Sequence, residues 1–483
     1  MGLTNFTFFL FCFISLVVYY VIPKKYSYIT LLLSSIAFLF YSDVTLLNIV
    51  YVLIILFTSY ISGMLIKKYE KNKKTITIVG VLIILLELVF LKYSNLLITT
   101  SNILFKTNFS LVSHSSPLGL SYYSLMMIGY IINVYWGSTE DEKNILKLST
   151  FMMYFPTLTS GPFIKYEDIK DELNERKNID ANNIMNGLIR SLWGLFKVLV
   201  ISTRLNIFVS TIYGDLSDYN SLIVFLSILL YTFELYTNFS GSIDIIMGVS
   251  KMFGINLPEN FNNPFASETI TEFWRRWHIT LGEWLRTYIF YPLLKSNVMQ
   301  NLTKKCKDLF GKKGKKIPTF ISMFILWVLI GIWHGGEYKY ILASGILQFI
   351  FIFFEDITNS VNKKCSKPIR FLRILRTFIL FSLSMVFFRA VSITEGLGIF
   401  KALANFSSGF NINFLSVVDY IIIGVSLIVL LVVDNFMDRI KAFASKIKLE
   451  YKLSIIFFLI IIVLLFGKYG LGFVSTDFIY GKF

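Results

Sequence analysis

The sequence has few of the residues that cross-link a chain or hold a metal ion. Its 483 residues include three cysteines and three histidines. The cysteines, Cys12, Cys306 and Cys365, show none of the spacings typical of disulfide frameworks or zinc ligands. The sequence also lacks a GxSxG turn, a P-loop and a metal-binding signature. We therefore expect no disulfide framework and no metal site.

Charge is scarce as well. Charged residues make up 16% of the chain and hydrophobic residues 55%, whereas a soluble protein of this length would divide into domains and carry more charge. The apolar runs are long and numerous, which predicts an all-α polytopic membrane protein. The formal net charge of +16 comes from lysine-rich loops, which suit anionic membrane lipids. We expect no nucleic-acid partner, because no motif for one accompanies the charge.

The order of apolar segments and basic clusters predicts a topology. The first apolar segment has no basic region before it and no cleavage site after it, so we expect it to be retained as the first helix. Every basic cluster falls on one side of the predicted spans, and the positive-inside rule assigns that side to the cytoplasm. We expect one domain, residues 1–483, in the cell membrane, with roughly eleven membrane segments and both termini outside. The candidate segments are residues 6–22, 27–41, 46–66, 76–91, 118–136, 184–207, 222–247, 317–333, 340–354, 378–388, 417–433 and 453–466.

Three further stretches depart from simple spans. Residues 93–117, which carry His114, are predicted to form an external segment. Residues 146–155 are too short to span a membrane and stop at Pro156, which predicts a re-entrant or broken helix. Residues 165–180 are charged and are predicted to form a helix on the cytoplasmic side.

The stretch 258–292 combines aromatic and basic residues in the middle of this apolar chain. From residue 273 onward, apolar positions recur at spacings of three and four, which predicts one amphipathic helix in the membrane interface with its indoles at headgroup depth. Glu268 and Thr269 suit the first-turn acid and the cap of this helix. Prolines and asparagines before it prevent regular structure and indicate a cavity. The apolar face comprises Phe273, Trp274, Trp277, Leu281, Trp284, Leu285, Tyr288 and Ile289.

Two histidines are candidates for chemistry. His334 lies between Trp333 and two glycines at the tip of a predicted helical hairpin, where a neutral imidazole could take a proton from a hydroxyl. The same pattern also fits an interfacial histidine packed on Trp333. For His278 this structural interpretation is the stronger one, and His114 is expected to be a loop residue.

Charged residues near the membrane have two interpretations. Arg275, Arg276 and Arg286 could hold an anionic donor, although interfacial arginines more often hold lipid phosphate. Glu234 and Asp244 could line a path through the membrane, although such residues more often satisfy neighbouring helices.

The run PENFNNPF at 258–265 and the run FWRRWH at 273–278, together with GIWHG at 331–335, resemble the signature of the membrane-bound O-acyltransferase (MBOAT) family. The resemblance is strongest to the bacterial branch of alginate and peptidoglycan O-acetyltransferases and teichoic-acid D-alanyl transferases. Asn238, Thr287 and Asn133 stand where that branch commonly has aspartate, which leaves the substrate open. Further similar stretches are residues 117–122, 160–162, 194–197, 238–241, 387–390 and 478–480.

The resemblance implies a helical bundle with re-entrant and interfacial helices around a central funnel. It also implies transfer of an acyl group, most simply acetyl, from a cytoplasmic thioester to a hydroxyl outside. Acetyl-CoA would be a co-substrate, with no permanently bound cofactor. His334 would act as the base or acyl relay, and His278 would line the path. The implied substrate-binding residues are Trp274, Arg275, Arg276, Trp277, Asn262, Asn263 and Trp333.

The resemblance further implies membrane lipids as partners, together with an extracytoplasmic SGNH-type acetyltransferase or a polysaccharide synthase complex. D-alanyl transfer to teichoic acid from a carrier protein is the alternative within the same chemistry, although the chain length favours the acetyl branch. A transporter or flippase would also explain many helices with polar residues, but it should show inverted repeats, which the sequence lacks. A purely structural subunit would not need the two histidines.

Overall fold

The computed structural model describes residues 2–41, 45–114, 116–358, 366–406, 412–444 and 446–470. These residues form helices and connecting loops, with one isolated antiparallel bridge between Phe261 and Trp277. The predicted all-α class is therefore confirmed. The predictions for Cys365 and for residues 478–480 fall outside the described residues.

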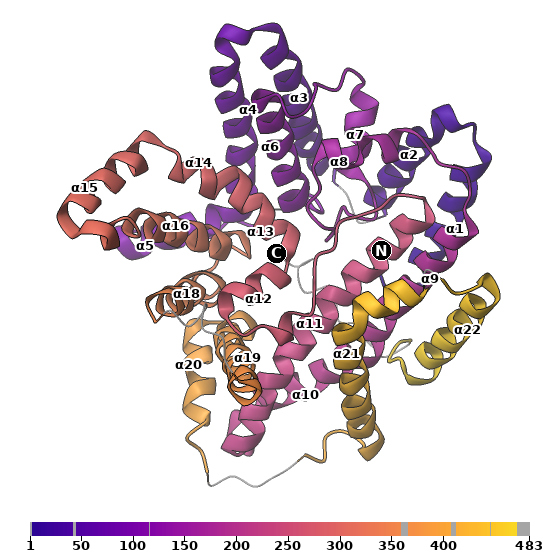
Figure 1. Ribbon diagram of the computed structural model, residues 1–483, viewed down its shortest axis with the longest axis vertical. Coiled ribbons are helices and arrows are strands. Elements are labelled where there is room, and N and C mark those ends of the chain that lie inside the picture. The colour runs from indigo at the N-terminus through magenta and orange to yellow at the C-terminus, as the bar shows by residue number, and fades with distance from the viewer. Residues whose placement is uncertain are drawn as a thin grey trace. The chain divides into compact units, whose positions relative to one another are not determined.

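The chain divides into two compact units, each of them helical (Figure 1). Unit 1 comprises Met1–Val200, Asn238–Pro258 and Asp438–Phe483, and unit 2 comprises Ile201–Thr237 and Glu259–Met437. The long helix α11 (Ser221–Met252) contributes its first part to unit 2 and its last part to unit 1. The single domain expected from the sequence stays a prediction.

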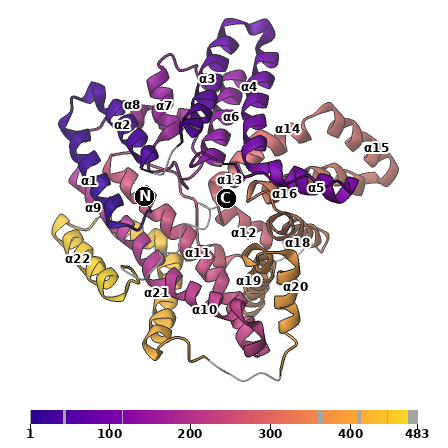
Figure 2. The ribbon, with the colours of Figure 1, turned by 180° about the vertical axis from the view of Figure 1, so that it is seen from behind.

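Unit 1 is built around a bundle in which α3, α4 and α6 pack side by side (Figures 1 and 2). An apolar groove of about 600 Å³ lies between α3 and α4, and none of its lining residues is a predicted site residue. The helices that begin in unit 1 are α1 (Phe6–Val21), α2 (Ser27–Phe40), α3 (Leu46–Lys68), α4 (Lys73–Leu88), α5 (Ser94–Phe105), α6 (Leu120–Trp136), α7 (Ile145–Met153), α8 (Tyr166–Asn174), α9 (Ala181–Leu195) and α22 (Leu449–Phe466).

The close approach of α9 to α11 in unit 1 depends on glycine and encloses a network of charges. A Cβ atom at Gly194 would lie 2.5 Å from the carbonyl oxygen of Gly241, so a larger residue would force the two helices apart. Beside this contact, Asp244 on α11 lies 2.5 Å from the Nζ atom of Lys197 and 3.0 Å from the guanidinium of Arg190. The lysine side chain is 4% exposed. Opposite charges therefore neutralise each other inside the unit, as one of the two interpretations of Asp244 anticipates.

Unit 2 contains the predicted hairpin, in which α16 is followed by α17, the π-helix η8 (Ile341–Ile346) and α18. This hairpin matches the prediction for residues 317–333 and 340–354. Another π-helix, η4 (Phe196–Ser202), connects α9 to α10. The helices that begin in unit 2 are α10 (Thr203–Gly214), α11, α12 (Ile270–Arg276), α13 (Ile279–Leu285), α14 (Tyr291–Leu294), α15 (Asn297–Gly314), α16 (Ile317–Trp333), α17 (Tyr338–Tyr340), α18 (Leu347–Ile357), α19 (Lys367–Arg389), α20 (Ile393–Ala402) and α21 (Val417–Ala444).

The number of candidate membrane spans is smaller than expected. Among the described residues, eight helices are long and apolar enough to cross a membrane, or nine if the bent pair α15 and α16 is one span. The predicted number of roughly eleven is therefore not confirmed. The predicted segments at α1, α2 and α6 form helices of 16, 14 and 17 residues, shorter than a typical span.

The external location predicted for residues 93–117 stays a prediction, and the structure shows that this segment begins as helix. The helical region Glu70–Phe105 continues through the π-helix η3 (Val89–Tyr93) into α5 and ends at Lys106, whose φ is +54°. The charge of Lys92 does not interrupt this helical region, because its Nζ atom donates to the hydroxyl of Ser121 at 2.7 Å.

Candidate active site

The central aromatic stretch forms two short helices rather than the single helix predicted. Helix α12 ends at Arg276, Trp277 is extended, and His278 has φ +48° and ψ 50°, in the left-handed region. This region is uncommon for residues other than glycine. Thr269 caps α12 as predicted and accepts from the N–H of Glu272 at 3.0 Å. The acid of the first turn is therefore Glu272, and Glu268 precedes the cap.

Asn260 holds the break in place. Its Oδ1 atom accepts hydrogen bonds from the N–H and the hydroxyl of Thr280, at 3.1 and 2.9 Å, and lies 3.2 Å from Nδ1 of His278. The N–H of Thr280 can only donate, so the side-chain amide atom of Asn260 that it faces must be the oxygen. Nδ1 of His278 must therefore carry the proton and donate it. The neutral imidazole consequently has its lone pair on Nε2.

His278 lies between α12 and α13, outside the candidate membrane spans, and is 2% exposed. Burial lowers the pKa of His278 well below its ordinary value of 6.5, and the nearby imidazole of His334 lowers it further. A low dielectric disfavours the imidazolium form, and a second imidazole nearby disfavours two positive charges side by side. The ring of His278 is therefore neutral at physiological pH.

His334 is placed by the turn that ends α16. The chain reverses at Gly336, which has φ +67° and whose N–H donates to the carbonyl of Ile332 at 3.0 Å. This arrangement is a glycine cap at a helix C-terminus. A Cβ atom at Gly331 would lie 2.6 Å from the Cα atom of Ile341, so this glycine allows α16 to approach η8 closely. His334 is thereby enclosed, with 2% of its surface exposed.

The imidazole rings of His278 and His334 both lie next to the indole of Trp333. The ring of Trp333 lies 5.9 Å from the ring of His278 and 5.1 Å from that of His334. The His334 ring also makes an edge contact with Phe388 at 5.4 Å. Residues far apart in the sequence are thus brought together in unit 2, and both imidazoles are buried in protein. Their catalytic roles remain predictions.

Trp274 and Trp277, two of the tryptophans predicted to bind substrate, have different surroundings. Trp277 is 1% exposed and stacks on Phe273 at 5.4 Å, so protein encloses this indole. Its predicted depth in the membrane stays a prediction. Trp274 is partly buried, and its Nε1 atom donates to Oε1 of Gln348 at 3.1 Å. Gln348 in turn donates to the hydroxyl of Ser384 at 2.7 Å. The orientation of Trp274 is therefore fixed by α18 and α19.

The four polar residues predicted to bind substrate differ in whether their side chains are bonded within the protein or exposed. Arg276 forms an ion pair with Glu272 at 2.8 Å, and the side-chain amide of Asn263 donates to Asn435 at 2.8 Å. Arg275 and Asn262 instead have exposed side chains. Their exposure leaves these two side chains accessible to a ligand. A substrate-binding role for any of the four stays a prediction.

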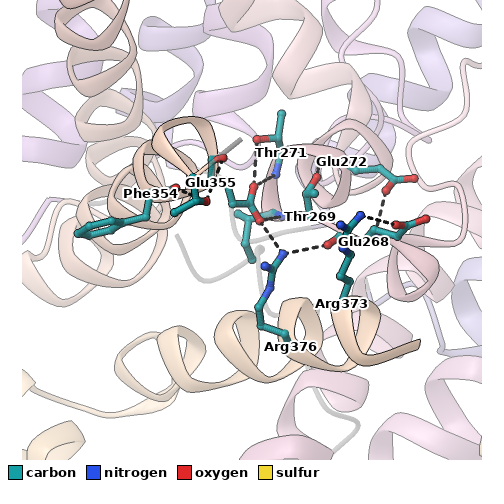
Figure 3. A network of polar contacts seen from close by, with 10 residues as sticks. Glu268, Thr269, Thr271, Glu272, Phe354, Glu355, Arg373 and Arg376 are labelled. Atoms are coloured by element: carbon teal, nitrogen blue, oxygen red, sulfur yellow. Dashed lines mark hydrogen bonds and ion pairs between the residues drawn. The ribbon is translucent and has the colours of Figure 1, made fainter. Parts of the chain in front are cut away.

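A buried carboxylate on α18 anchors the start of α12 (Figure 3). Glu355 accepts from the N–H groups of Ile270 and Thr271, at 2.7 and 3.1 Å, and lies 3.4 Å from the guanidinium of Arg376. Arg376 also donates to the carbonyl of Glu268 at 3.0 Å. The negative charge satisfies the free N–H groups at the helix N-terminus. The segment leading to His278 is therefore fixed to α18 and α19.

Sequence reasoning missed three residues that support the site. Asn260 was recognised only as part of an irregular loop, although its side chain orients His278. Gln348 and Glu355 were not singled out, although isolated polar residues in an apolar helix are a usable signal of this kind. Among the described residues, no group of three His, Cys, Asp or Glu side chains could hold a metal ion.

Many apolar helices and a buried pair of imidazoles define a polytopic membrane protein with a candidate acid–base centre. Residues 33–303 match the model of the membrane-bound O-acyltransferase family, MBOAT. Because this match covers more than half of the 483 residues, the chain belongs to that family. The resemblance stated from the sequence is confirmed.

Curated relatives of several kinds share this similarity. The chain is 29% identical over 411 residues to a probable alginate O-acetylase of Azotobacter vinelandii, covering 83% of this chain and 78% of that protein. It is 26% identical over 343 residues to a peptidoglycan O-acetyltransferase of Helicobacter pylori, covering 65% and 62% respectively. It is 30% identical over 245 residues to a teichoic acid D-alanyltransferase of Bacillus subtilis, covering 50% and 60%. The chain thus spans less than two thirds of the last two relatives.

Proposed function

We propose that this protein moves an acyl group, most simply acetyl, from a cytoplasmic thioester to a hydroxyl of an extracytoplasmic polysaccharide or partner protein. The observation that carries this proposal is the convergence of two buried imidazoles on Trp333. Membership of an O-acyltransferase family supports the reaction class. The same membership leaves the transporter alternative without support.

The chemistry needs a base and protection from water rather than a protein nucleophile, because a thioester is already activated. The acceptor oxygen attacks the acyl carbon while its proton passes to the imidazole of His334. The carbon–sulfur bond then breaks, and the thiolate leaves and takes up a proton. General base catalysis typically contributes about 10²–10⁴-fold. Burial of the imidazoles excludes the bulk water that would hydrolyse the donor.

His278 has a positioning role in this scheme. Its bond to Asn260 fixes the ring plane and keeps the proton on Nδ1. The lone pair of the neutral ring is therefore on Nε2. Precise orientation of two reactants lowers a reaction barrier by several kcal/mol.

Acetyl-CoA is the proposed co-substrate. The exposed side chain of Arg275 supports contact with an anionic donor. The proposal places the basic loops in the cytoplasm and the termini outside. It also includes membrane lipids and an SGNH-type acetyltransferase or a polysaccharide synthase complex as partners.

A second candidate is transfer of a D-alanyl group from a carrier protein. The match to the Bacillus subtilis teichoic acid D-alanyltransferase favours it, although that match covers 50% of this chain. The match to the alginate O-acetylase covers 83% and supports the acetyl alternative.

The test is transfer of label from acetyl-CoA by the purified protein in liposomes. Alginate oligosaccharides, peptidoglycan fragments and lipoteichoic acid serve as acceptors. We expect the wild type to acetylate one of them, and we expect His334→Ala to reduce the rate about 10²–10⁴-fold. His114→Ala is the matched control, because His114 contacts the ring of Phe90 in unit 1 and belongs to no candidate site. Its activity should equal that of the wild type.

Two results would contradict the proposal. The first is full activity in a His334→Ala protein, or an equal loss in His114→Ala. The second is a wild type that neither transfers nor hydrolyses the acetyl group. If D-alanine moves from a carrier-protein thioester under the same conditions, the second candidate replaces the first. Size-exclusion profiles of all variants separate loss of chemistry from loss of folding.

A further inference from the structure

The apolar groove of about 600 Å³ in unit 1 has no part in the proposed reaction. It lies between α3 and α4, which pack side by side and are joined by the short turn Glu70–Asn72 (Figures 1 and 2). The outermost lining residues of α3, Val50 and Leu65, are fifteen positions apart, so the groove runs about 22 Å along this helix. This length is more than half of the hydrocarbon core of a membrane, which is about 30 Å thick. The groove is therefore long enough for an extended acyl chain.

Small residues form the floor of the groove. A Cβ atom at Gly80 would lie 2.4 Å from the hydroxyl oxygen of Ser62, so the two helices approach closely at this level. Larger apolar side chains stand on either side of this floor. Ile61 of α3 and Val79 of α4 line the groove, and each has 49% of its surface exposed. In lipid surroundings, packing contacts favour a bound chain, and a groove of this shape offers more of them than a flat helix face.

One end of the groove opens beside a cluster of lysines. Leu65 and Thr75 line this end, next to the turn that joins the two helices. Five lysines and one glutamate give residues 67–75 a net charge of +4. Basic clusters at the end of a membrane span attract anionic lipid headgroups. The five lysines, all with exposed side chains, are Lys67, Lys68, Lys71, Lys73 and Lys74.

Helical spacing brings one of these lysines onto the face of α3 that lines the groove. Ile61 and Leu65 both line the groove and lie one helical turn apart. Lys68 follows Leu65 by three positions and therefore lies on the same face. Its Nζ atom is 5.4 Å from the centre of the Tyr69 ring. Lys67 is turned about 100° away from this face.

An apolar groove that ends at a cationic cluster fits a ligand with a hydrocarbon chain and a negatively charged head. A zwitterionic lipid carries a positive charge of its own, and an apolar helix of another protein would leave the lysines without a counter-charge. We propose that the groove binds an anionic phospholipid, with one acyl chain between α3 and α4 and the phosphate beside Lys68. The site belongs to unit 1, whereas both histidines belong to unit 2. The inference goes beyond the proposed acyltransferase function and does not depend on it.

Native mass spectrometry of the full-length protein in detergent tests the groove, with phosphatidylglycerol and phosphatidylcholine as probes. We expect the wild type to retain phosphatidylglycerol in preference to phosphatidylcholine. Val79→Trp fills the groove and should lower the affinity for phosphatidylglycerol about 10-fold, which the loss of roughly ten carbon–carbon contacts would produce. Ile61→Trp fills the groove from α3 and should repeat this loss.

Ile78→Trp is the matched control. Ile78 precedes Val79 and is 48% exposed, but it does not line the groove. This variant should retain phosphatidylglycerol as the wild type does. Equal retention in Ile78→Trp and Val79→Trp would overturn the inference, because lipid would then coat the whole apolar surface without a defined site.

The charged end of the site is tested with Lys68→Gln. Loss of one lysine near a lipid surface should lower the preference for phosphatidylglycerol over phosphatidylcholine by about fivefold. Lys67→Gln removes the same charge from a different face of α3 and should have a smaller effect. An equal loss in the two variants would overturn the placement of the phosphate beside Lys68. Equal retention of both lipids by the wild type would overturn the anionic ligand.

Thermal unfolding in detergent gives a second measurement. A ligand that binds the folded protein raises its unfolding temperature. Added phosphatidylglycerol should therefore stabilise the wild type and Ile78→Trp, but not Val79→Trp. Equal stabilisation of all three proteins would contradict the inference. A delipidated wild type that forms a dimer, which Val79→Trp converts into a monomer, would also overturn it, since a second copy of the chain would then occupy the groove.

Discussion

Asp244 and Glu234 are both buried acids of α11, but their surroundings differ. Asp244, in unit 1, lies between the cations of Lys197 and Arg190 at hydrogen-bonding distances. Glu234, in unit 2, has an oxygen without a hydrogen-bond partner among the described residues. The sequence presents both as acids at helical spacing in an apolar segment and does not tell them apart.

The difference shows that burial alone does not define a role for a charged residue in a membrane protein. A carboxylate enclosed by cations stabilises the contact between its helix and the next one. A buried carboxylate without such partners lowers the stability of the folded state, which is expected where a protein keeps the group for binding or catalysis. The comparison predicts that the two acids respond in opposite ways to neutralisation.

The largest effect is expected from neutralising Asp244. Asp244→Asn leaves Lys197 buried without its counter-charge, which should lower the free energy of unfolding by about 3–5 kcal/mol. Glu234→Gln breaks no hydrogen bond of the Oε2 atom among the described residues and should leave stability unchanged or raise it. Thermal unfolding of both variants in detergent measures the contrast. If both proteins lose the same stability, Glu234 has partners that match those of Asp244, and the comparison fails.

Replacing Asn260 should have an intermediate effect on stability, because one end of its side-chain amide is fully hydrogen-bonded. Its Oδ1 atom has three partners, whereas its Nδ2 atom has no partner among the described residues. Asn260→Ala leaves the buried N–H of Thr280 unbonded and should cost about 1–3 kcal/mol. Asn262→Ala is the control, since that side chain is exposed. A stability loss in the Asn262 variant as large as that in Asn260→Ala would contradict the role given to Asn260.

The smallest effect is expected from titration of His278. Its pKa in the folded protein is lowered, so the unfolded chain takes up a proton near pH 6.5 that the folded protein does not bind. The contribution of His278 to the free energy of unfolding is therefore fully present above about pH 6.5. Below this pH it falls by about 1.4 kcal/mol per pH unit, until the pKa of the folded protein is reached. His278→Gln should remove this slope, and His114→Gln should keep it. Unfolding curves between pH 5 and 8 give the measurement, and identical slopes in all three proteins would refute the prediction.

Much of the fold could be predicted because it depends on local apolar pattern. The hairpin of α16 and α18, the long apolar part of α11 and the cap at Thr269 follow from hydrophobic runs and from residues close in sequence. The helical continuation past Lys92 could not be predicted in this way. It depends on Ser121, which belongs to another helix and whose hydroxyl accepts a hydrogen bond from Lys92.

The break at His278 shows the limit most clearly. Apolar spacing across residues 273–289 is continuous, so the sequence predicts one helix through this point. The left-handed conformation of His278 is compensated by the hydrogen bonds of Asn260, which precedes it by 18 residues. Phe261 of the same loop packs its ring against Trp277 at 5.2 Å. Periodicity cannot reveal a conformation that is stabilised by a single distant amide.

The bond between Asn260 and His278 also limits where protons can travel. Oδ1 of Asn260 is an acceptor that already receives two hydrogen bonds from Thr280, so it cannot carry a proton away from Nδ1. A proton arriving at Nε2 of His278 would therefore have to depart from the same nitrogen. Asn260 is therefore a closed end for proton conduction, and in the proposed reaction the proton of the acceptor is assigned to His334.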